Sequence, residues 1–174
     1  MNATGPAATA LSVHSRAVGC CNAGDVEGFA DLHAPDAVLV TPAGTFRGRA
    51  AIRRYCAGIR AAFPDLNLRV GLAVEHGDTV VAEWVGTGSN TGPVALPDGT
   101  SRPATGRAIA HRGMQVAHVR AGRIVEHHLY WDRLATARQL GVAADPDQQP
   151  APDADRRRVS LPPGPWLTGL GLGS

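Results

Sequence analysis

A histidine and a glutamine on two neighbouring predicted strands are the candidates for acid–base chemistry. His127 lies in the segment 123–131 and Gln115 in the segment 107–120. An unperturbed imidazole titrates near pH ~6.5, so His127 could take up or return a proton near neutral pH. The Gln115 amide could donate a hydrogen bond to an enolate oxygen, as in an oxyanion hole. We therefore expect both to be catalytic; the alternative is that they line the interior as hydrogen-bonded residues without proton transfer.

A second group of residues could contact a substrate. Trp84 and Trp131 offer flat apolar surfaces that suit a polycyclic or conjugated molecule, although plain core packing is the alternative. Tyr55 could also reach the substrate, although it could instead pack in the core. His111 could reach the mouth of the cavity, although it could instead lie at the surface. The complete set of expected substrate-binding residues is Trp131, Trp84, Leu129, Tyr55, Thr41 and His111.

Other polar residues have structural interpretations. Asp132 directly precedes a predicted helix and is expected to be its N-cap, and Glu83 is expected on the outward face of its strand. The three cysteines have no evident base partner and are expected to be small core residues. Four histidines are expected at the surface or in helix packing: His14, His33, His76 and His118.

Composition excludes several classes of protein. The chain has 174 residues, of which 44% are apolar and 18% charged, and its net charge is +2. All seventeen basic residues are arginine, but they are too scattered for a nucleic-acid surface. No apolar run approaches the ~18 residues of a membrane span, and no secretory signal is evident. Adjacent Cys20 and Cys21, with one further cysteine, favour a reducing compartment and hence a cytoplasmic protein. Neither a phosphate loop nor metal-ligand spacing is present.

The pattern of apolar residues divides the chain into three parts and predicts an α+β fold. We expect a flexible segment 1–9, a folded domain 10–143 and a Pro-, Gly- and Arg-rich tail 144–174. Helices are predicted at 11–22, 26–33, 49–63 and 133–140, and strands at 37–41, 66–75, 79–89, 107–120 and 123–131. Residues 90–105 are predicted to be a long loop. The order indicates helices and a short hairpin, followed by a four-stranded antiparallel meander.

Several short segments carry a family resemblance. Residues 32–38, 48–52, 62–66, 119–127, 130–132 and 138–141 together resemble, in order and spacing, the SnoaL-like polyketide cyclases of the NTF2-like superfamily. The resemblance implies a cone-shaped barrel in which a curved antiparallel sheet wraps around N-terminal helices and encloses a deep, mainly apolar cavity. It also implies a homodimer, no metal or organic cofactor, and ring closure by intramolecular aldol chemistry.

The resemblance also suggests which strand residues face the cavity. When the turn before Ile124 is aligned with the corresponding turn of the family, His127, Leu129 and Trp131 face the cavity. Gln115 on the preceding strand then faces the cavity as well. The acid–base aspartate of the cyclases then corresponds to Leu129, and their second polar residue corresponds to Gln115. In the related steroid isomerases the aspartate corresponds to Thr41 and the tyrosine to Ala17. Because Leu cannot transfer a proton, neither known acid–base set is intact.

We therefore expect a cofactor-independent cyclase or isomerase that acts on a polyketide-like or other apolar intermediate of secondary metabolism. A hydrolase or hydroxylase of the same fold is an alternative, but the related epoxide hydrolases need an Asp–Arg–Asp set that cannot be assembled on inward positions here. A non-catalytic small-molecule binding protein is the third possibility. The expected partners are a small apolar or polycyclic substrate and a second copy bound through the outer sheet face, with no nucleic acid or membrane.

Overall fold

The computed structural model describes residues 8–95 and 100–143. Most of the expected N-terminal segment, 1–7, and the whole expected tail, 144–174, lie outside the described residues. No helix among the described residues combines the length and the apolar character needed to cross a membrane.

Four helices form close to their predicted positions, and three of them begin with a side-chain cap. The side chains of Thr9, Asp25 and Asp132 accept hydrogen bonds from backbone amides of the first turns that follow them. Such caps satisfy amides that have no partner inside the helix, and Asp132 is thus confirmed as an N-cap. The helices are α1 (Ala10–Ala23), α2 (Val26–Asp31), α3 (Arg49–Ala62) and α4 (Arg133–Gln139).

Six strands form one curved sheet in the order β2-β1-β8-β7-β4-β3. Their bounds are β1 (His33–Thr41), β2 (Gly44–Arg47), β3 (Asn67–His76), β4 (Thr79–Ser89), β7 (Ala108–Arg120) and β8 (Arg123–Trp131). The last four strands form the predicted antiparallel meander. Since β1 pairs with β8 in parallel, the sheet is mixed rather than wholly antiparallel as expected.

The predicted loop contains a small separate sheet. Strands β5 (Val94–Ala95) and β6 (Ser101–Arg102) pair with each other. The buried side chain of Asn90 holds this segment in place. Its amide N–H groups donate to the carbonyls of Ala62 and Gly92, and its amide oxygen accepts from the backbone N–H of Thr105.

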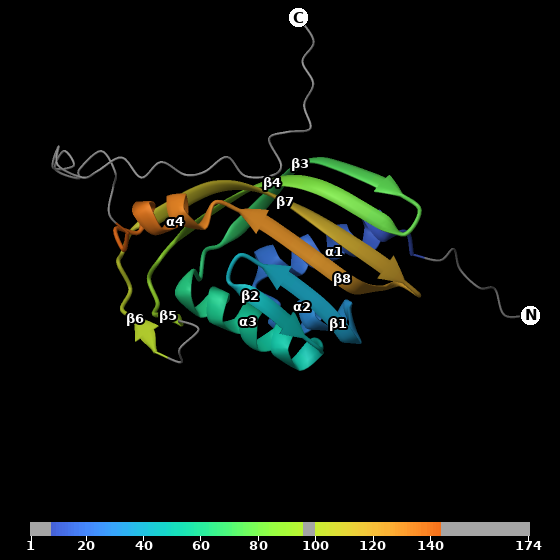
Figure 1. Cartoon of the computed structure of the whole chain (residues 1–174), viewed down its shortest axis with the longest axis horizontal. Helices are drawn as coiled ribbons and strands as arrows, with labels where there is room; N and C mark the ends of the chain where they lie inside the picture. The colour runs from blue at the N-terminus through green and yellow to red at the C-terminus, as the bar shows by residue number, and fades with distance from the viewer. Residues whose placement is uncertain (1–7, 96–99, 144–174) are drawn as a thin grey trace, which may run out of the picture. The chain divides into compact units, whose positions relative to one another are not determined.

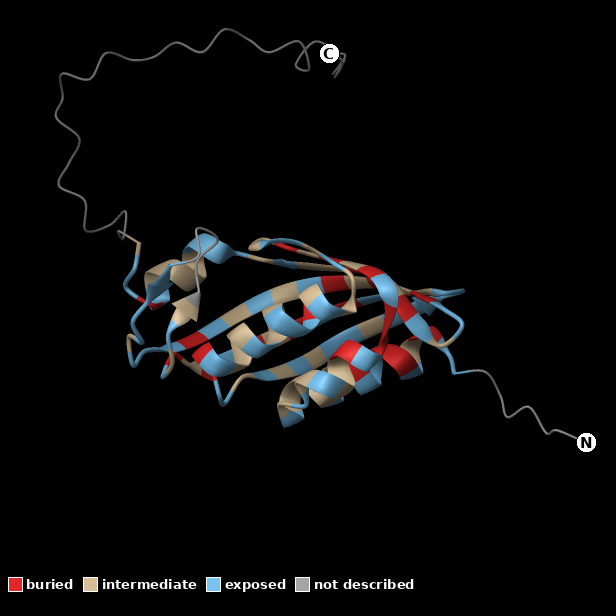
Figure 2. Cartoon of the chain, turned by 90° about the horizontal axis from the view of Figure 1, so that it is seen from below, coloured by how far each residue is buried: buried red, intermediate tan, exposed pale blue. Residues whose placement is uncertain are grey.

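The sheet bends over α1, α2 and α3, which lie on the same side of it (Figure 1). Figure 2 shows that buried residues occur both on the helices and on the strands. One apolar cluster joins α1 to β4, β7 and β8 around Val13, Val80 and Ile124. A second joins α3 to β1 around Ile52 and Leu39. The chain therefore has its core between the helices and the concave face of the sheet.

Strand β3 departs from the predicted alternation. The sequence predicts that Leu68, Val70, Leu72 and Val74 share one face, but the register with β4 shifts between Val70 and Leu72. This β-bulge, at Gly71, reverses the sides of the residues that follow it. As a result, Leu72 and Val74 are 56% and 55% exposed on the outer face.

Candidate functional site

Four polar side chains form a continuous buried chain in the interior. The His33 ring bonds to the Phe29 carbonyl through Nδ1 (2.9 Å) and to His127 Nδ1 through Nε2 (3.3 Å). His127 Nε2 lies 3.1 Å from Gln115 Oε1, and Gln115 Nε2 lies 2.5 Å from His14 Nε2. All four side chains are at most 2% exposed. We call this set, His14, Gln115, His127 and His33, the histidine–glutamine chain.

Four different elements supply these residues. His14 comes from α1 and His33 from the first position of β1, whereas Gln115 and His127 come from β7 and β8. The strand register places small residues beside the two central members: Ala82 lies opposite Gln115, and Ala117 lies opposite His127. Both alanines are almost completely buried. Their small size leaves space on the sheet for the amide and the imidazole.

The surroundings keep the three imidazoles neutral. Burial lowers the pKa of His14, and burial together with the nearby Arg49 guanidinium lowers the pKa of His33. The pKa of His127 is well below its usual value, mainly because of burial and also because charge on His33 or His14 would repel charge on its own ring. Desolvation penalises the charged form of a base, so neutral rings dominate at neutral pH.

The two expected catalytic residues are brought together, and two histidines that the sequence interpretation left out of the site join them. His14 and His33 are 1% and 0% exposed, so of the two expected placements the surface one is wrong for both, whereas helix packing is confirmed for His14 on the buried face of α1. A signal for His14 existed, because Ala10, Val13, His14 and Ala17 have the spacing of one buried helix face. For His33 no comparable signal existed, since the register of β1 is irregular directly after it.

Both ring nitrogens of His127 are engaged within the chain. The ring therefore has no free lone pair with which to contact a ligand directly. His127 can still take part in proton transfer, but only through the hydrogen bonds that it makes with His33 and Gln115.

An aromatic cluster occupies the next positions along the sheet. Trp84 lies edge-on to His111 at 5.5 Å between ring centroids, and His111 stacks with Trp131 at 6.2 Å. Trp84 is 4% exposed, yet its indole N–H has no hydrogen-bond partner among the residues that the structure describes. A buried donor without an acceptor is costly. The cluster thus combines flat surfaces with one unused hydrogen-bond donor.

The remaining expected contacts lie between α3 and β1. Tyr55 stacks on Phe46 at 4.2 Å, and burial raises the pKa of its phenol to about 12. The Thr41 hydroxyl donates to the Gly44 carbonyl and accepts from the Ala43 amide. Leu129 packs against the cluster that contains Tyr55. Tyr55 and Leu129 therefore belong to the packed core around Ile52, and none of the three residues belongs to the histidine–glutamine chain.

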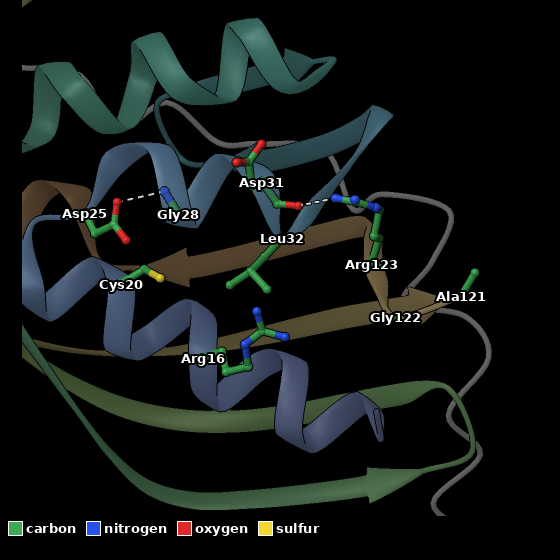
Figure 3. A pocket seen from close by; sticks show the side chains of 9 residues that line it. All are labelled: Arg16, Cys20, Asp25, Gly28, Asp31, Leu32, Ala121, Gly122 and Arg123. Atoms are coloured by element: carbon green, nitrogen blue, oxygen red, sulfur yellow. Dashed lines mark hydrogen bonds between the residues drawn. The ribbon is translucent and has the colours of Figure 1, made fainter. Parts of the chain in front are cut away.

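One hollow lies away from these residues, between α1, α2 and the β7–β8 turn. It has a volume of about 620 Å³, and its lining includes Arg16, Asp25, Asp31 and Arg123 (Figure 3). Arg123 donates to the Asp31 carbonyl, and Asp25 caps α2, so both have structural partners. No expected site residue lines this hollow.

A smaller hollow of about 220 Å³ lies between α1 and β3. Its lining consists of His14, Ser15, Val18, Val70 and Ala73. The first of these is an end member of the histidine–glutamine chain. This hollow therefore touches the buried chain, whereas the larger one does not.

The arginine ion pairs of the described residues do not form an Asp–Arg–Asp set. Arginine ion pairs join Arg49 to Asp31 and Arg53 to Glu27, each with a single carboxylate that is largely exposed. Within residues 8–95 and 100–143, no group of three or more His, Cys, Asp or Glu side chains could hold a metal ion.

Known structures share this fold. A proposed polyketide cyclase from Jannaschia sp. CCS1 superposes with a TM-score of 0.68 at 17% identity, covering 83% of this chain and 100% of that one. AclR, a proposed hydroxylase from Streptomyces galilaeus, gives 0.65 at 21% identity, covering 78% and 83%. IdmH, a proposed polyketide cyclase from Streptomyces antibioticus, gives 0.59 at 30% identity, covering 76% and 99%.

No curated protein matches the sequence. The family model of the SnoaL-like domain matches residues 15–127, which include Gln115, His127, all of β7 and the first half of β8. The chain belongs to the SnoaL-like domain family and has its ketosteroid isomerase-like, NTF2-like fold.

Proposed function

We propose that this protein is a cofactor-independent cyclase or isomerase of an apolar, polyketide-like intermediate. The observation that carries the proposal is the histidine–glutamine chain. Burying four polar side chains in a core is unfavourable unless every hydrogen bond is made. Three neutral imidazoles in such a chain provide the basic groups that proton abstraction beside a carbonyl requires.

The aromatic cluster supports the substrate class. The rings of Trp84, His111 and Trp131 offer flat surfaces to a conjugated molecule, and the unpaired Trp84 N–H could donate to one of its carbonyl oxygens. A donor to that oxygen would stabilise negative charge as it develops on an enolate. Similarity to two proposed polyketide cyclases points to the same class of ligand.

The test is enzyme-catalysed enolisation. Acetophenone and 1-tetralone in D₂O would be incubated with the full chain, and deuterium incorporation beside the carbonyl would be followed by mass spectrometry. The proposal expects exchange faster than in buffer, lost in His127→Phe, and kept in His76→Gln, which alters an exposed histidine at the end of β3. If the folded protein and buffer exchange both ketones equally, the acid–base function is wrong.

A non-catalytic binding protein is the second candidate. It is favoured by the absence of a free lone pair on His127 and by Leu129 at the position of the cyclase aspartate. It would bind the same ketones without exchanging their protons. A hydrolase or hydroxylase finds less support, because the described ion pairs of Arg49 and Arg53 are exposed and each involves one carboxylate.

We further propose that the outer face of the sheet binds a second copy of the chain. Five large apolar residues with exposed fractions of 38–56% point outward from neighbouring strands: Leu72, Val74, Val81, Met114 and Tyr130. The register places Val74 beside Val81, and it places Leu72, Glu83, Met114 and Tyr130 in the neighbouring row, so the five apolar residues lie in two adjacent rows. Exposed apolar patches of this kind mark interaction sites, and a two-fold dimer would cover the same patch on both copies.

A further inference from the structure

We propose that His14 is the residue that exchanges a proton with the ligand, and that the reacting part of the ligand lies in the hollow between α1 and β3. Gln115, His127 and His33 then act as positioning residues that hold His14 in its basic tautomer. The proposal rests on the acid–base function proposed above and deepens it by naming the base and its side of the fold.

The hollow beside His14 is bounded by two fixed attachments of α1 to β3. At one end, the Glu75 carboxylate accepts from the Leu11 amide at 2.9 Å. At the other, the Asn22 side chain bonds to both the N–H and the carbonyl of Leu68, at 2.7 and 2.9 Å. Between these attachments the helix and the strand do not close on each other, which leaves the hollow of about 220 Å³.

The bulge at Gly71 keeps this space open. With regular alternation, Leu72 and Val74 would point toward α1. The register shift turns them outward and places Ala73 against the hollow instead. A methyl group therefore stands where a larger side chain would fill the space. Bulges next to functional sites are common because they redirect side chains in this way.

Hydrogen bonding within the chain determines where the protons are. The Phe29 carbonyl and Gln115 Oε1 can only accept, and two imidazoles, His33 and His127, lie between them. Three hydrogen bonds in this stretch need three protons, whereas two neutral imidazoles carry two. With Gln115 Oε1 toward His127, all hydrogen bonds of the histidine–glutamine chain are therefore made only when it holds one extra proton.

Turning the Gln115 amide by 180° removes this requirement. The two ends of an amide are nearly equal in size, so both orientations fit the same space. Gln115 Nε2 then donates to His127, His127 Nδ1 donates to His33, and His33 Nδ1 donates to the Phe29 carbonyl. His14 Nε2 donates to Gln115 Oε1. All four links are made by neutral rings and point in one direction, which strengthens each of them.

The neutral arrangement is the one that this interior favours. None of the four side chains makes an ion pair with a carboxylate within the described residues. The Arg49 guanidinium donates to the His33 carbonyl at 2.8 and 3.1 Å and opposes a second positive charge there. With no anion to compensate it, a buried imidazolium is unfavourable.

In the neutral arrangement, His14 is the member with a free lone pair. Its Nε2 carries the proton that is donated to Gln115, so its Nδ1 is unprotonated. Nδ1 has no hydrogen-bond partner among the described residues, and the ring lines the hollow. His127 and His33, by contrast, use both nitrogens. The exchangeable position of the chain is therefore at His14.

The proton-transfer step follows from this geometry. A C–H beside a carbonyl gives its proton to His14 Nδ1, and the C–H electron pair passes into the enolate. His14 becomes an imidazolium whose Nε2–H still donates to Gln115. The proton then returns to another carbon of the enolate in an isomerisation, or to the alkoxide formed when the enolate carbon attacks a second carbonyl.

The size and lining of the hollow define the reacting fragment. Val18, Val70 and Ala73 are apolar, and the Ser15 hydroxyl is the polar group beside His14. A dry cavity of ~150 Å³ accepts benzene, so about 220 Å³ fits one six-membered ring with a short carbonyl substituent. Acetophenone has this size and carries exchangeable hydrogens beside its carbonyl.

The first test measures the tautomers without any ligand. Long-range ¹H–¹⁵N spectra of the full chain with labelled histidine, recorded at pH 8, distinguish Nδ1–H from Nε2–H rings. We expect Nε2–H for His14 and Nδ1–H for His127 and His33. Gln115→Met, which cannot accept from His14, should abolish the preference at His14. A His14 ring protonated at Nδ1 would overturn the proposal, while leaving enolisation by another group possible.

The second test examines separately the role of His14 as the base and the role of the hollow as the place where the ligand binds. His14→Gln keeps a hydrogen-bonding end toward Gln115 but cannot take a proton, and Ala73→Leu fills the hollow. Both should reduce deuterium exchange into acetophenone at least 100-fold, while Ala73→Leu keeps the tautomers of all three rings. His76→Gln is the control and should exchange as the parent does. If the parent exchanges and His14→Gln matches it, His14 is not the base although the proposed function stands; if the folded parent does not exchange, the proposed function itself fails.

Discussion

The rings of His33 and His127 share a single hydrogen bond, with Nε2 of one 3.3 Å from Nδ1 of the other. One proton occupies that link, so the two rings can be neutral together or carry one charge between them, but two charges would repel at close range. Because the pair is completely buried, its charge state is coupled to folding. This coupling leads to a measurable dependence of stability on pH.

The free energy of unfolding should fall as the pH is lowered from 7.5 to 5.5. In the folded chain the pKa values of His14, His33 and His127 are lowered, whereas in the unfolded chain they return to about 6.5. The unfolded state then binds more protons than the folded state, so stability is complete above the unfolded pKa and is lost below it. Each such proton contributes up to about 1.4 kcal/mol per pH unit.

Denaturant unfolding at several pH values would measure this slope. His111 contributes in the same direction, because burial lowers its pKa as well. The chosen range lies above that of Asp65 and Glu126, whose pKa values are lowered by hydrogen bonds. His14→Gln should reduce the slope, and the exposed-site control His76→Gln should not. Stability that is constant or rises toward pH 5.5 would contradict the buried neutral chain.

Much of this fold could be predicted from the sequence because its signals are local. Apolar spacing and caps place the four helices within one or two residues, and alternation places β4, β7 and β8. The parallel pairing of β1 with β8 could not be predicted, since it joins segments about 90 residues apart. The bulge at Gly71 was also missed, although a glycine inside a strand is a known sign of one.

The site was predictable only in part. Gln115 and His127 were expected to face inward because the family resemblance set the phase of the alternation on two strands, and both are buried. His33 joins them because a distant strand end meets β8, which no local pattern reports. The roles of these residues in catalysis remain predictions, because residue type and position establish contact but not turnover.

A carboxylate in place of the central amide should reverse the charge preference of the chain. Gln115→Glu would accept from His14 Nε2 and His127 Nε2 at once, as the geometry of the two links allows. An anion between two imidazoles favours their protonated forms and raises their pKa. Titration of the histidine side chains by NMR should show this rise, and stability should then be lost less steeply, or not at all, between pH 7.5 and 5.5.

Gln115→Met is the uncharged comparison for that variant. It keeps the side-chain length but leaves His14 and His127 each without one partner, which should cost about 2–4 kcal/mol of stability. The pKa of neither ring should rise. If the histidines of the Gln115→Glu and Gln115→Met variants have the same pKa values, the histidine–glutamine chain does not act as one hydrogen-bonded unit.

Gly113 should be intolerant of any side chain, because Trp84 lies against it. A Cβ at this position would be 2.3 Å from Cζ2 of Trp84 and 2.6 Å from the Tyr130 carbonyl. Gly113→Ala should therefore displace the indole, change its fluorescence and lower stability by about 1–3 kcal/mol. Gly58→Ala in α3 is the matched control: nothing lies within 4 Å of its Cβ, and alanine favours a helix by about 0.5–1 kcal/mol. Equal thermal stability of the two variants would mean that Trp84 does not lie across Gly113.

The outer-face dimer predicts that one charge on β7 separates the copies. Met114 is 42% exposed and lies opposite both Glu83 and Tyr130, near the middle of the patch. Met114→Arg would place two buried like charges across a two-fold interface and should convert the dimer to a monomer in sedimentation experiments. Leu134→Arg is the control, because Leu134 is 51% exposed on α4 and not on the sheet. A parent chain that sediments as a monomer, or a Met114→Arg variant that remains dimeric, would show that this face does not hold the second copy.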